Sequence, residues 1–373
     1  MEQLAPHEKV FVDPSFIEED KKHGNLGCTF CHGGDPNNPD YETAHSGVRK
    51  DPSYPDASGT CGICHTDSVK HYETSLHYTL EPYIRTIKMR SSRDNAKREK
   101  INTAMERHCL TCHSSCGQCH VSRPDPAHGG LLESHIFKKE PLMQEVCTSC
   151  HGSRVGPEFL GMNEGIPADI HRQKSYFKCT SCHSSVEMHG DGVEYANRYE
   201  VATAPECESC HRDVYTSQGE NTTQHTIHKD KVSCQVCHAM PYKNCWECHV
   251  GTDDQGLTFF RTKATKMDFK IGLNPARDER HPEKFVTVRH IPVDFNTFSF
   301  YVEDGLSEFN MLPNWKMTTP HTIRRETPQN SSCDSCHGNE SIFLSLEDVE
   351  EKYREANKEV IVPKELIPAK VGK

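Results

Sequence analysis

The chain has 373 residues, of which 34% are hydrophobic, and its mean hydropathy of -0.75 is low for a protein with ordinary apolar cores. Its formal net charge of -11 disfavours nucleic acid and anionic membranes as partners, because both would repel an acidic surface. No apolar run approaches the roughly 20 residues that span a bilayer, so we expect no transmembrane segment.

All 20 cysteines lie in ten Cys-x-x-Cys-His motifs. This pentapeptide is the attachment signature of c-type haem, since its two thiols can form thioethers to one porphyrin and its histidine can bind the iron. The expected cofactors are therefore ten haem c groups with their iron. The cofactor-binding residues are Cys28, Cys31, Cys61, Cys64, Cys109, Cys112, Cys116, Cys119, Cys147, Cys150, Cys179, Cys182, Cys207, Cys210, Cys234, Cys237, Cys245, Cys248, Cys333 and Cys336. The proximal iron ligands are His32, His65, His113, His120, His151, His183, His211, His238, His249 and His337.

Zinc sites and disulfides are the alternatives, because paired Cys-x-x-Cys units build both. A zinc site does not need a histidine directly after the second cysteine. All ten motifs have one, although only 25 of the 373 residues are histidine. We therefore favour haem, which would also supply the apolar core that the polypeptide lacks.

Residues 1–130 form the first expected domain and contain motifs one to four. Residues 1–27 read as an extended arm with one short helix, in which His7 and His23 are either surface residues or ligands. The arm lacks the pattern of a signal peptide. We expect that such a peptide has been removed, because c-type haem is attached outside the cytoplasmic membrane.

Two helical patterns follow within this domain. Residues 66–90 place apolar side chains on one stripe, and residues 91–107 predict a highly charged helix with a solvated face. Only Ser114 and Ser115 separate motifs three and four, so two haems must lie almost in contact there. Electrons could pass directly between them.

The remainder of the chain divides into three expected domains. Residues 131–250 carry motifs five to nine and leave room only for short helices. Residues 251–332 contain no motif, and strands are predicted at Val286–Arg289 and Phe295–Val302, in a segment that shields haem edges or supplies distal ligands. Residues 333–373 carry motif ten, a helix over 346–358 and a tail. The expected fold class is thus mostly α and irregular, packed around haem, with little regular secondary structure and a small β-rich insert free of haem.

Fifteen further histidines could give every iron a second imidazole ligand. Bis-histidine haem is closed to substrate, transfers single electrons and has a lower potential than histidine-methionine haem. The candidate distal ligands are His45, His77, His108, His135, His171, His189, His225, His228, His290 and His321. A distal lysine such as Lys70 or Lys174 is the alternative for individual irons.

The motif array resembles bacterial and archaeal multihaem c-type cytochromes, which serve anaerobic respiration and extracellular electron transfer. The likeness rests on the ten motifs and on flanks such as Cys61-Gly-Ile-Cys-His65 followed by Ser75-Leu-His77, and it covers about 28–249 and 321–340. One branch of that class contains electron conduits, including surface cytochromes that polymerise into filaments. A more distant likeness is to octahaem tetrathionate reductase, whose relatives keep one iron open or unusually ligated. No Cys-x-x-Cys-Lys motif is present, so the site of pentahaem nitrite reductase is not expected.

We therefore expect a decahaem electron-transfer protein rather than an enzyme. The resemblance implies a secreted conduit at the cell surface or beyond it, with the periplasm as the alternative location. Its partners would be redox proteins, an external electron acceptor and copies of itself, in a conductive filament with haem ligation between subunits. The alternative functions are a multihaem oxidoreductase acting on a small sulfur or nitrogen oxyanion, and a periplasmic electron store.

Overall fold

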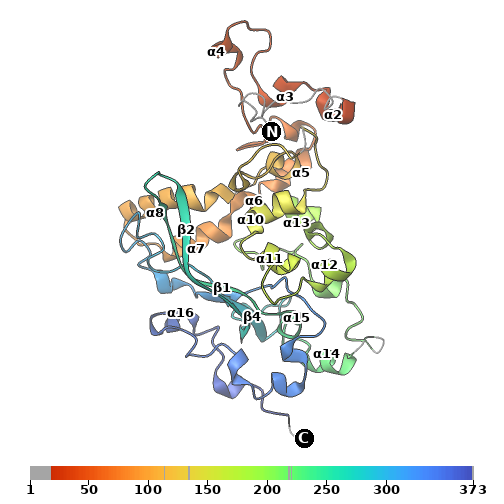
Figure 1. Ribbon diagram of the computed structural model, residues 1–373, viewed down its shortest axis with the longest axis vertical. Coiled ribbons are helices and arrows are strands. Elements are labelled where there is room, and N and C mark those ends of the chain that lie inside the picture. Colours follow the sequence, from red (N-terminus) through yellow and green to blue (C-terminus); the bar gives the residue numbers. More distant parts are fainter. Residues whose placement is uncertain (1–17, 113, 133–134, 217–218, 220, 372–373) are drawn as a thin grey trace. The chain divides into compact units, whose positions relative to one another are not determined.

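A computed structural model of the chain describes residues 18–112, 114–132, 135–216, 219 and 221–371. Short helices and irregular segments make up most of it, and two small antiparallel sheets lie in the C-terminal half (Figure 1). This confirms the predicted mostly helical and irregular fold with a small β-rich part. The chain divides into two units, and each unit is assembled from separate segments of the sequence.

The first unit comprises residues 1–82, 111–152 and 178–204 and contains motifs one, two, four, five and six with most of motif three. Its described helices are α2 (Lys21–Gly24), α3 (Cys28–His32), α4 (Tyr41–Ala44), α5 (Thr66–Tyr72), α6 (Leu76–Thr79), α9 (Cys116–His120), α10 (Thr148–His151) and α13 (Ser185–His189). Its buried apolar side chains, such as Val69 and Val146, are scattered and form no cluster among the described residues. Polypeptide alone gives this unit little core, which leaves room for large apolar cofactors.

The second unit comprises residues 83–110, 153–177 and 205–373 and contains motifs seven to ten. Its helices are α7 (Glu81–Arg90, which begins at the end of the first unit), α8 (Asn95–His108), α11 (Val155–Leu160), α12 (Ile170–Ser175), α14 (Thr222–His228), α15 (Cys234–His238) and α16 (Arg354–Asn357). Its strands are β1 (Tyr242–Thr252), β2 (Thr258–Asp268), β3 (Lys270–Leu273), β4 (Phe285–His290) and β5 (Trp315–Met317).

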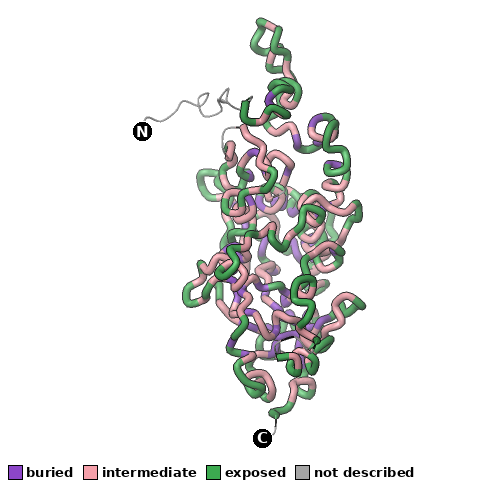
Figure 2. Tube along the Cα trace, turned by 90° about the vertical axis from the view of Figure 1, so that its right-hand side faces the viewer, coloured by how far each residue is buried: buried purple, intermediate pink, exposed green. Residues whose placement is uncertain are grey.

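Both sheets of the second unit are antiparallel. Strands β1 and β2 form a long hairpin, and β3, β4 and β5 form a three-stranded sheet in that order. Three clusters of buried apolar side chains pack around these strands, and their positions are purple in Figure 2. The second unit therefore has a conventional protein core, which the composition of the whole chain did not predict.

The helical predictions were right in part. The charged helix is confirmed as α8, which begins where the Asp94 side chain accepts a hydrogen bond from the Lys97 N–H and buries Ile101 and Met105. The stretch 66–90 is helical but consists of α5, α6 and α7. A left-handed residue, Leu80 with φ of 49°, ends α6.

Two other element predictions were wrong. Phe295–Val302 is not a strand, because hydrogen bonds between residues three apart fold it into turns that bury Phe298. The predicted helix over 346–358 is reduced to a 3-10 turn at Glu351–Tyr353 and the single turn of α16, since this segment instead packs Val349 and Tyr353 into a core cluster. By contrast, Val286–Arg289 lies within β4 as predicted.

None of the described helices is both long and apolar enough to cross a bilayer.

Candidate haem-binding site

The Cys-x-x-Cys-His motifs have a similar local backbone, with one exception. Nine of the ten contain a turn of helix within their described residues, and the tenth, at Cys245, lies on strand β1. At Cys61, the backbone N–H of His65 donates to the Cys61 carbonyl at 2.8 Å. This turn brings two thiols and an imidazole to one side of the chain, as attachment of a single porphyrin requires. All 20 cysteines are free thiols, so the structure does not support the disulfide alternative.

Seven motif histidines each face a histidine from outside the motifs. In every pair the centres of the two imidazole rings lie 5.8 to 6.3 Å apart. The pairs are His65 with His23, His32 with His135, His151 with His77, His120 with His189, His211 with His171, His238 with His225, and His337 with His228. Six of these seven partners are among the candidate distal ligands.

This separation fits an iron between two imidazoles. An imidazole nitrogen bonds a transition metal at about 2 Å, and the ring centre lies about 1 Å beyond it. Two imidazoles on opposite sides of one metal therefore have centres about 6 Å apart. Rings that merely stacked on each other would come closer, as His23 does on Phe137 at 4.0 Å. The paired residues thus fit bis-histidine haem.

Hydrogen bonds fix the orientation of many of these rings. An Nδ1–H that donates to an oxygen leaves Nε2 unprotonated and available to a metal. The Nδ1 atoms of His32, His120, His228, His238 and His337 lie 2.6 to 3.1 Å from backbone carbonyl oxygens. Those of His23 and His171 lie 2.9 Å from the carboxylates of Asp20 and Asp169. In seven of the fourteen paired rings, the Nδ1 contact therefore leaves Nε2 available to bind iron.

Burial also keeps individual rings neutral. Loss of hydration, followed by the neighbouring His151 imidazole, lowers the pKa of His77 to about 4. Burial likewise lowers the pKa of His135 and of His189. A neutral imidazole is the form that binds iron, so these environments favour ligation.

Contacts between thiols show which motifs of the first unit are neighbours. The side chains of Cys61 and Cys116 lie close together, which makes motif two a neighbour of motif four. Motif five is joined to motif three and to motif six by further thiol contacts. Cys150 lies close to Cys112, and Cys147 lies close to Cys179. Neighbours in space are thus not always neighbours in sequence.

The second unit has a corresponding series of three motifs. The sulfur atoms of Cys207 and Cys234 lie within 4.8 Å of each other, which makes motif seven a neighbour of motif eight. Burial, and then the nearby Cys237 thiol, raise the pKa of Cys336 to about 11, which places motif ten beside motif eight. Haems attached at these thiols would lie close together.

The structure also shows contacts for the other four candidate distal histidines. His45 is exposed, and its ring lies 4.2 Å from that of Tyr41. Buried His108 has its Nε2 2.7 Å from the Tyr301 hydroxyl. His290 stacks on Trp246, with its Nδ1 2.7 Å from the Cys245 carbonyl oxygen.

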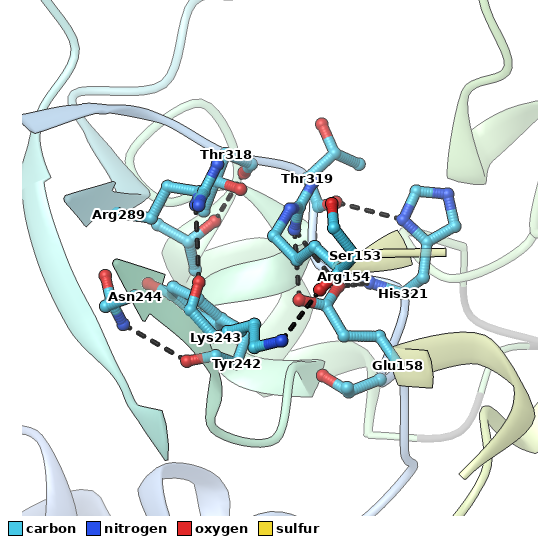
Figure 3. Close-up of polar contacts among 12 residues, drawn as sticks. Ser153, Arg154, Glu158, Tyr242, Lys243, Asn244, Arg289, Thr318, Thr319 and His321 are labelled. Carbon is cyan, nitrogen blue, oxygen red and sulfur yellow. Dashed lines mark hydrogen bonds and ion pairs between the residues drawn. The ribbon is translucent and has the colours of Figure 1, made fainter. Parts of the chain in front are cut away.

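The fourth, His321, lies beside a buried ion pair. Both carboxylate oxygens of Glu158 accept hydrogen bonds from the Arg154 guanidinium, at 3.1 and 3.0 Å, and one also accepts from the backbone N–H of His321 at 3.0 Å (Figure 3). The His321 Nδ1 lies 3.1 Å from the carbonyl oxygen of Thr319. This network fixes the backbone and the ring of His321 together.

Three motif histidines and the two candidate lysines complete the predicted site. His113 lies outside the described residues. His183 has its Nδ1 2.9 Å from the Glu187 carboxylate, and His249 has its Nδ1 3.2 Å from the Asn296 carbonyl oxygen. Lys70 and Lys174 are exposed on α5 and α12.

Sequence reasoning left the role of His23 open. The structure places it opposite His65, with Asp20 on its Nδ1. The available signal was the aspartate three residues before it, because a carboxylate at that spacing on a helical turn can orient the ring.

The zinc alternative finds no site among the described residues. Only one group there brings three His, Cys, Asp or Glu ligand atoms within 4.8 Å of one another, namely Cys207, Glu208 and Cys234. A structural zinc site needs four ligands in a tetrahedron. The histidines instead occur in facing pairs, a geometry that suits a metal with two axial ligands.

One family profile agrees with this chemistry. The profile of the family described as cytochrome c554 and c-prime matches residues 60–152 and 184–239, which is less than half of the chain. No curated protein matches it significantly. Among solved structures, the chain is similar to an octahaem cytochrome c from Shewanella oneidensis, with a TM-score of 0.44 and 14% sequence identity, over 80% of this chain and 94% of the other.

Proposed function

We propose that this multihaem c-type cytochrome transfers electrons through ten covalently bound haems, seven of which have iron held between two histidines. The observation that carries the proposal is the set of seven imidazole pairs at 5.8 to 6.3 Å. Haem supplies a reversible one-electron iron couple when it is bound. The chain's own residues attach the porphyrin, fix the ring orientation through Nδ1 and close both axial positions to other ligands.

The thiol contacts support a continuous path inside each unit. Motif five, with three neighbouring motifs, is the branching point of the first unit. Cys119 of motif four lies close enough to affect the ionisation of Cys147 and Cys150. In the second unit the path runs through motifs seven, eight and ten. At the motifs of these series that have an imidazole pair, bis-histidine ligation keeps the potentials low and requires little rearrangement on electron transfer.

Electron paramagnetic resonance of the fully oxidised protein tests this proposal. We expect low-spin ferric signals from at least seven haems per chain, because two imidazoles give a strong axial field. The number of low-spin haems per chain is obtained by comparing the integrated low-spin signal with the total haem content of the sample. A spectrum dominated by high-spin iron would overturn the assignment of the pairs as axial ligands.

We further propose a secreted conduit that delivers electrons to an external acceptor and assembles into filaments. His45 supports assembly, because it is exposed and its Nδ1 lies 2.8 Å from the Tyr41 carbonyl oxygen, as in the paired ring of His228. A ring prepared in this way could bind iron in another copy. Electron micrographs of the native protein that show only discrete particles would contradict filament formation.

A further inference from the structure

The imidazole pair at motif seven has a carboxylate on one of its two rings. The ring centres of His171 and His211 lie 6.0 Å apart, and the His171 Nδ1 lies 2.9 Å from a carboxylate oxygen of Asp169. The same oxygen accepts the backbone N–H of His171 at 2.9 Å, at the start of α12. An anion therefore orients this ring, where most of the other oriented rings contact a neutral carbonyl oxygen.

Asp169 is itself fixed in the protein interior. Its side chain is only 5% exposed, and its second carboxylate oxygen accepts the backbone N–H of Ile323 at 3.0 Å. The carbonyl oxygen of Ile323 in turn accepts the N–H of Ile170 at 2.9 Å. These bonds hold the charge of Asp169 next to the His171 ring and away from bulk water.

The neighbouring motif eight is oriented by the next residue of the same segment. Arg324 follows Ile323, and its backbone N–H donates to the His238 carbonyl at 2.8 Å, while its own carbonyl oxygen lies 3.0 Å from the His238 Nδ1. At motif ten, the Nδ1 atoms of His337 and His228 lie 3.1 and 2.8 Å from carbonyl oxygens. The series of motifs seven, eight and ten thus combines one carboxylate contact with contacts to neutral oxygens.

A carboxylate on Nδ1 affects the iron as well as the orientation of the ring. It polarises the Nδ1–H bond and makes the imidazole a stronger electron donor through Nε2, which favours the ferric state. Its negative charge acts in the same direction, because oxidation adds a positive charge to the haem. A carbonyl oxygen has a smaller effect, since hydrogen bonds to ionised groups are roughly twice as strong as those between neutral groups.

We propose that Asp169 is a positioning residue that lowers the reduction potential of the haem at motif seven and thereby makes this motif the electron entry of its series. The inference rests on the proposed function, because it requires a haem at Cys207 and Cys210 with iron between His211 and His171. Motif eight lies beside motif seven and also beside motif ten. An electron received by the lowest-potential haem passes to neighbours of higher potential, so the gradient directs it from motif seven towards motif ten.

The variant D169N removes the charge and nearly preserves the shape of the side chain. We expect an optically monitored redox titration to show one haem with a higher potential. At the potential where this haem is half reduced in the wild type, its ratio of reduced to oxidised form should rise roughly five- to tenfold, because a charge-assisted hydrogen bond becomes a neutral one. The haem should stay low-spin. A purely structural role of Asp169 would instead release His171 and produce high-spin iron.

Variants that each lack one haem assign the potentials to motifs. C207A/C210A removes the attachment of the motif-seven haem, which intact mass confirms, and D169N in that background should leave the remaining potentials unchanged. C234A/C237A and C333A/C336A identify the haems of motifs eight and ten in the same way. We expect motif seven to have the lowest potential of the three. D169E keeps the charge and should stay closer to the wild-type potential than D169N.

E158Q is the matched control for D169N. Glu158 is also a buried carboxylate that accepts a backbone N–H from the same segment, that of His321, but its charge is shared with the Arg154 guanidinium and not with an imidazole. E158Q should therefore lower the stability of the protein while shifting the motif-seven potential much less than D169N does.

Asp20 allows the same test in the first unit. Its carboxylate lies 2.9 Å from the Nδ1 of His23, which faces His65, but its side chain is 16% exposed. Water screens this charge more than that of Asp169. D20N should therefore raise the potential of the motif-two haem, and by a smaller factor.

The outcomes separate this inference from the proposed function. A D169N protein that keeps its low-spin haems at wild-type potentials overturns the role of Asp169 and leaves electron transfer through the paired haems intact. A shift that persists in C207A/C210A overturns its assignment to motif seven, and a lower potential at motif eight or ten overturns the direction of flow. A wild-type protein without low-spin haem overturns the proposed function itself.

Discussion

H228G converts one haem per chain from low-spin to high-spin iron and adds one CO equivalent to the reduced protein. His228 faces His337 at 6.2 Å, and glycine removes the imidazole without placing another ligand there. We expect this haem to change its spin state completely, because its iron keeps only one histidine ligand, that of His337. Optical spectra and spin quantitation before and after CO addition measure it.

The matched control is H45G. His45 belongs to the same set of candidate ligands and has the same kind of Nδ1 contact, but it faces no described motif histidine. Its removal should leave the spin state and the CO stoichiometry of the dispersed protein unchanged. If H45G opened a haem while H228G did not, the pairing read from the imidazole distances would be wrong.

R154M should be the most destabilising single change outside the motifs. Glu158 is fully buried, and its carboxylate would lose its only described cationic partner while remaining in the protein interior. Removing one member of a buried ion pair costs about 3–5 kcal/mol. We expect the second unit of R154M to unfold at a clearly lower denaturant concentration than that of the wild type. The fluorescence of Trp246 and Trp315 measures this unfolding.

The double variant R154M/E158M is the control for this experiment. It removes both charges and replaces them with apolar side chains, so it should recover much of the lost stability. The His321 N–H loses its acceptor in the double variant, and a residual deficit is expected for that reason. Equal stability of R154M and the wild type would show that the ion pair does not hold this region.

The sequence predicted the chemistry of the site better than its geometry. The motif spacing pointed to haem because two thiols and an imidazole within five residues can all reach one porphyrin. Which histidine faces which motif depends on contacts between distant segments. His228 and His337, for example, are more than a hundred residues apart, and no local pattern relates them.

Two histidines show why the distal ligands predicted from the sequence were only partly right. His290 was a natural candidate by its position in the motif-free segment, but the fold gives it hydrogen bonds at both nitrogens and a stacking partner in Trp246. Burial lowers its pKa to about 4, as expected for a neutral ring in a protein core. His23 shows the reverse case, since an arm with no strong pattern places it opposite His65.

The secondary structure was likewise predicted correctly where local sequence determines it and wrongly where distant segments do. Local signals were sufficient for α8, which has a capping aspartate and a long helical sequence. They failed at Phe295–Val302, where aromatic residues that favour strands instead fill a core through successive turns. They also did not predict that motif nine lies on a strand, because the pairing of β1 with β2 is decided by the segment after the motif.

The central claim is that the motifs hold covalently bound haem between facing histidines. The intact mass of the native protein, measured under denaturing conditions that remove any non-covalent group, tests it most directly. We predict a mass that exceeds the 42.3 kDa polypeptide by ten haem groups, apart from any processing of the chain ends. A mass equal to the bare polypeptide, from a colourless protein, would contradict the account.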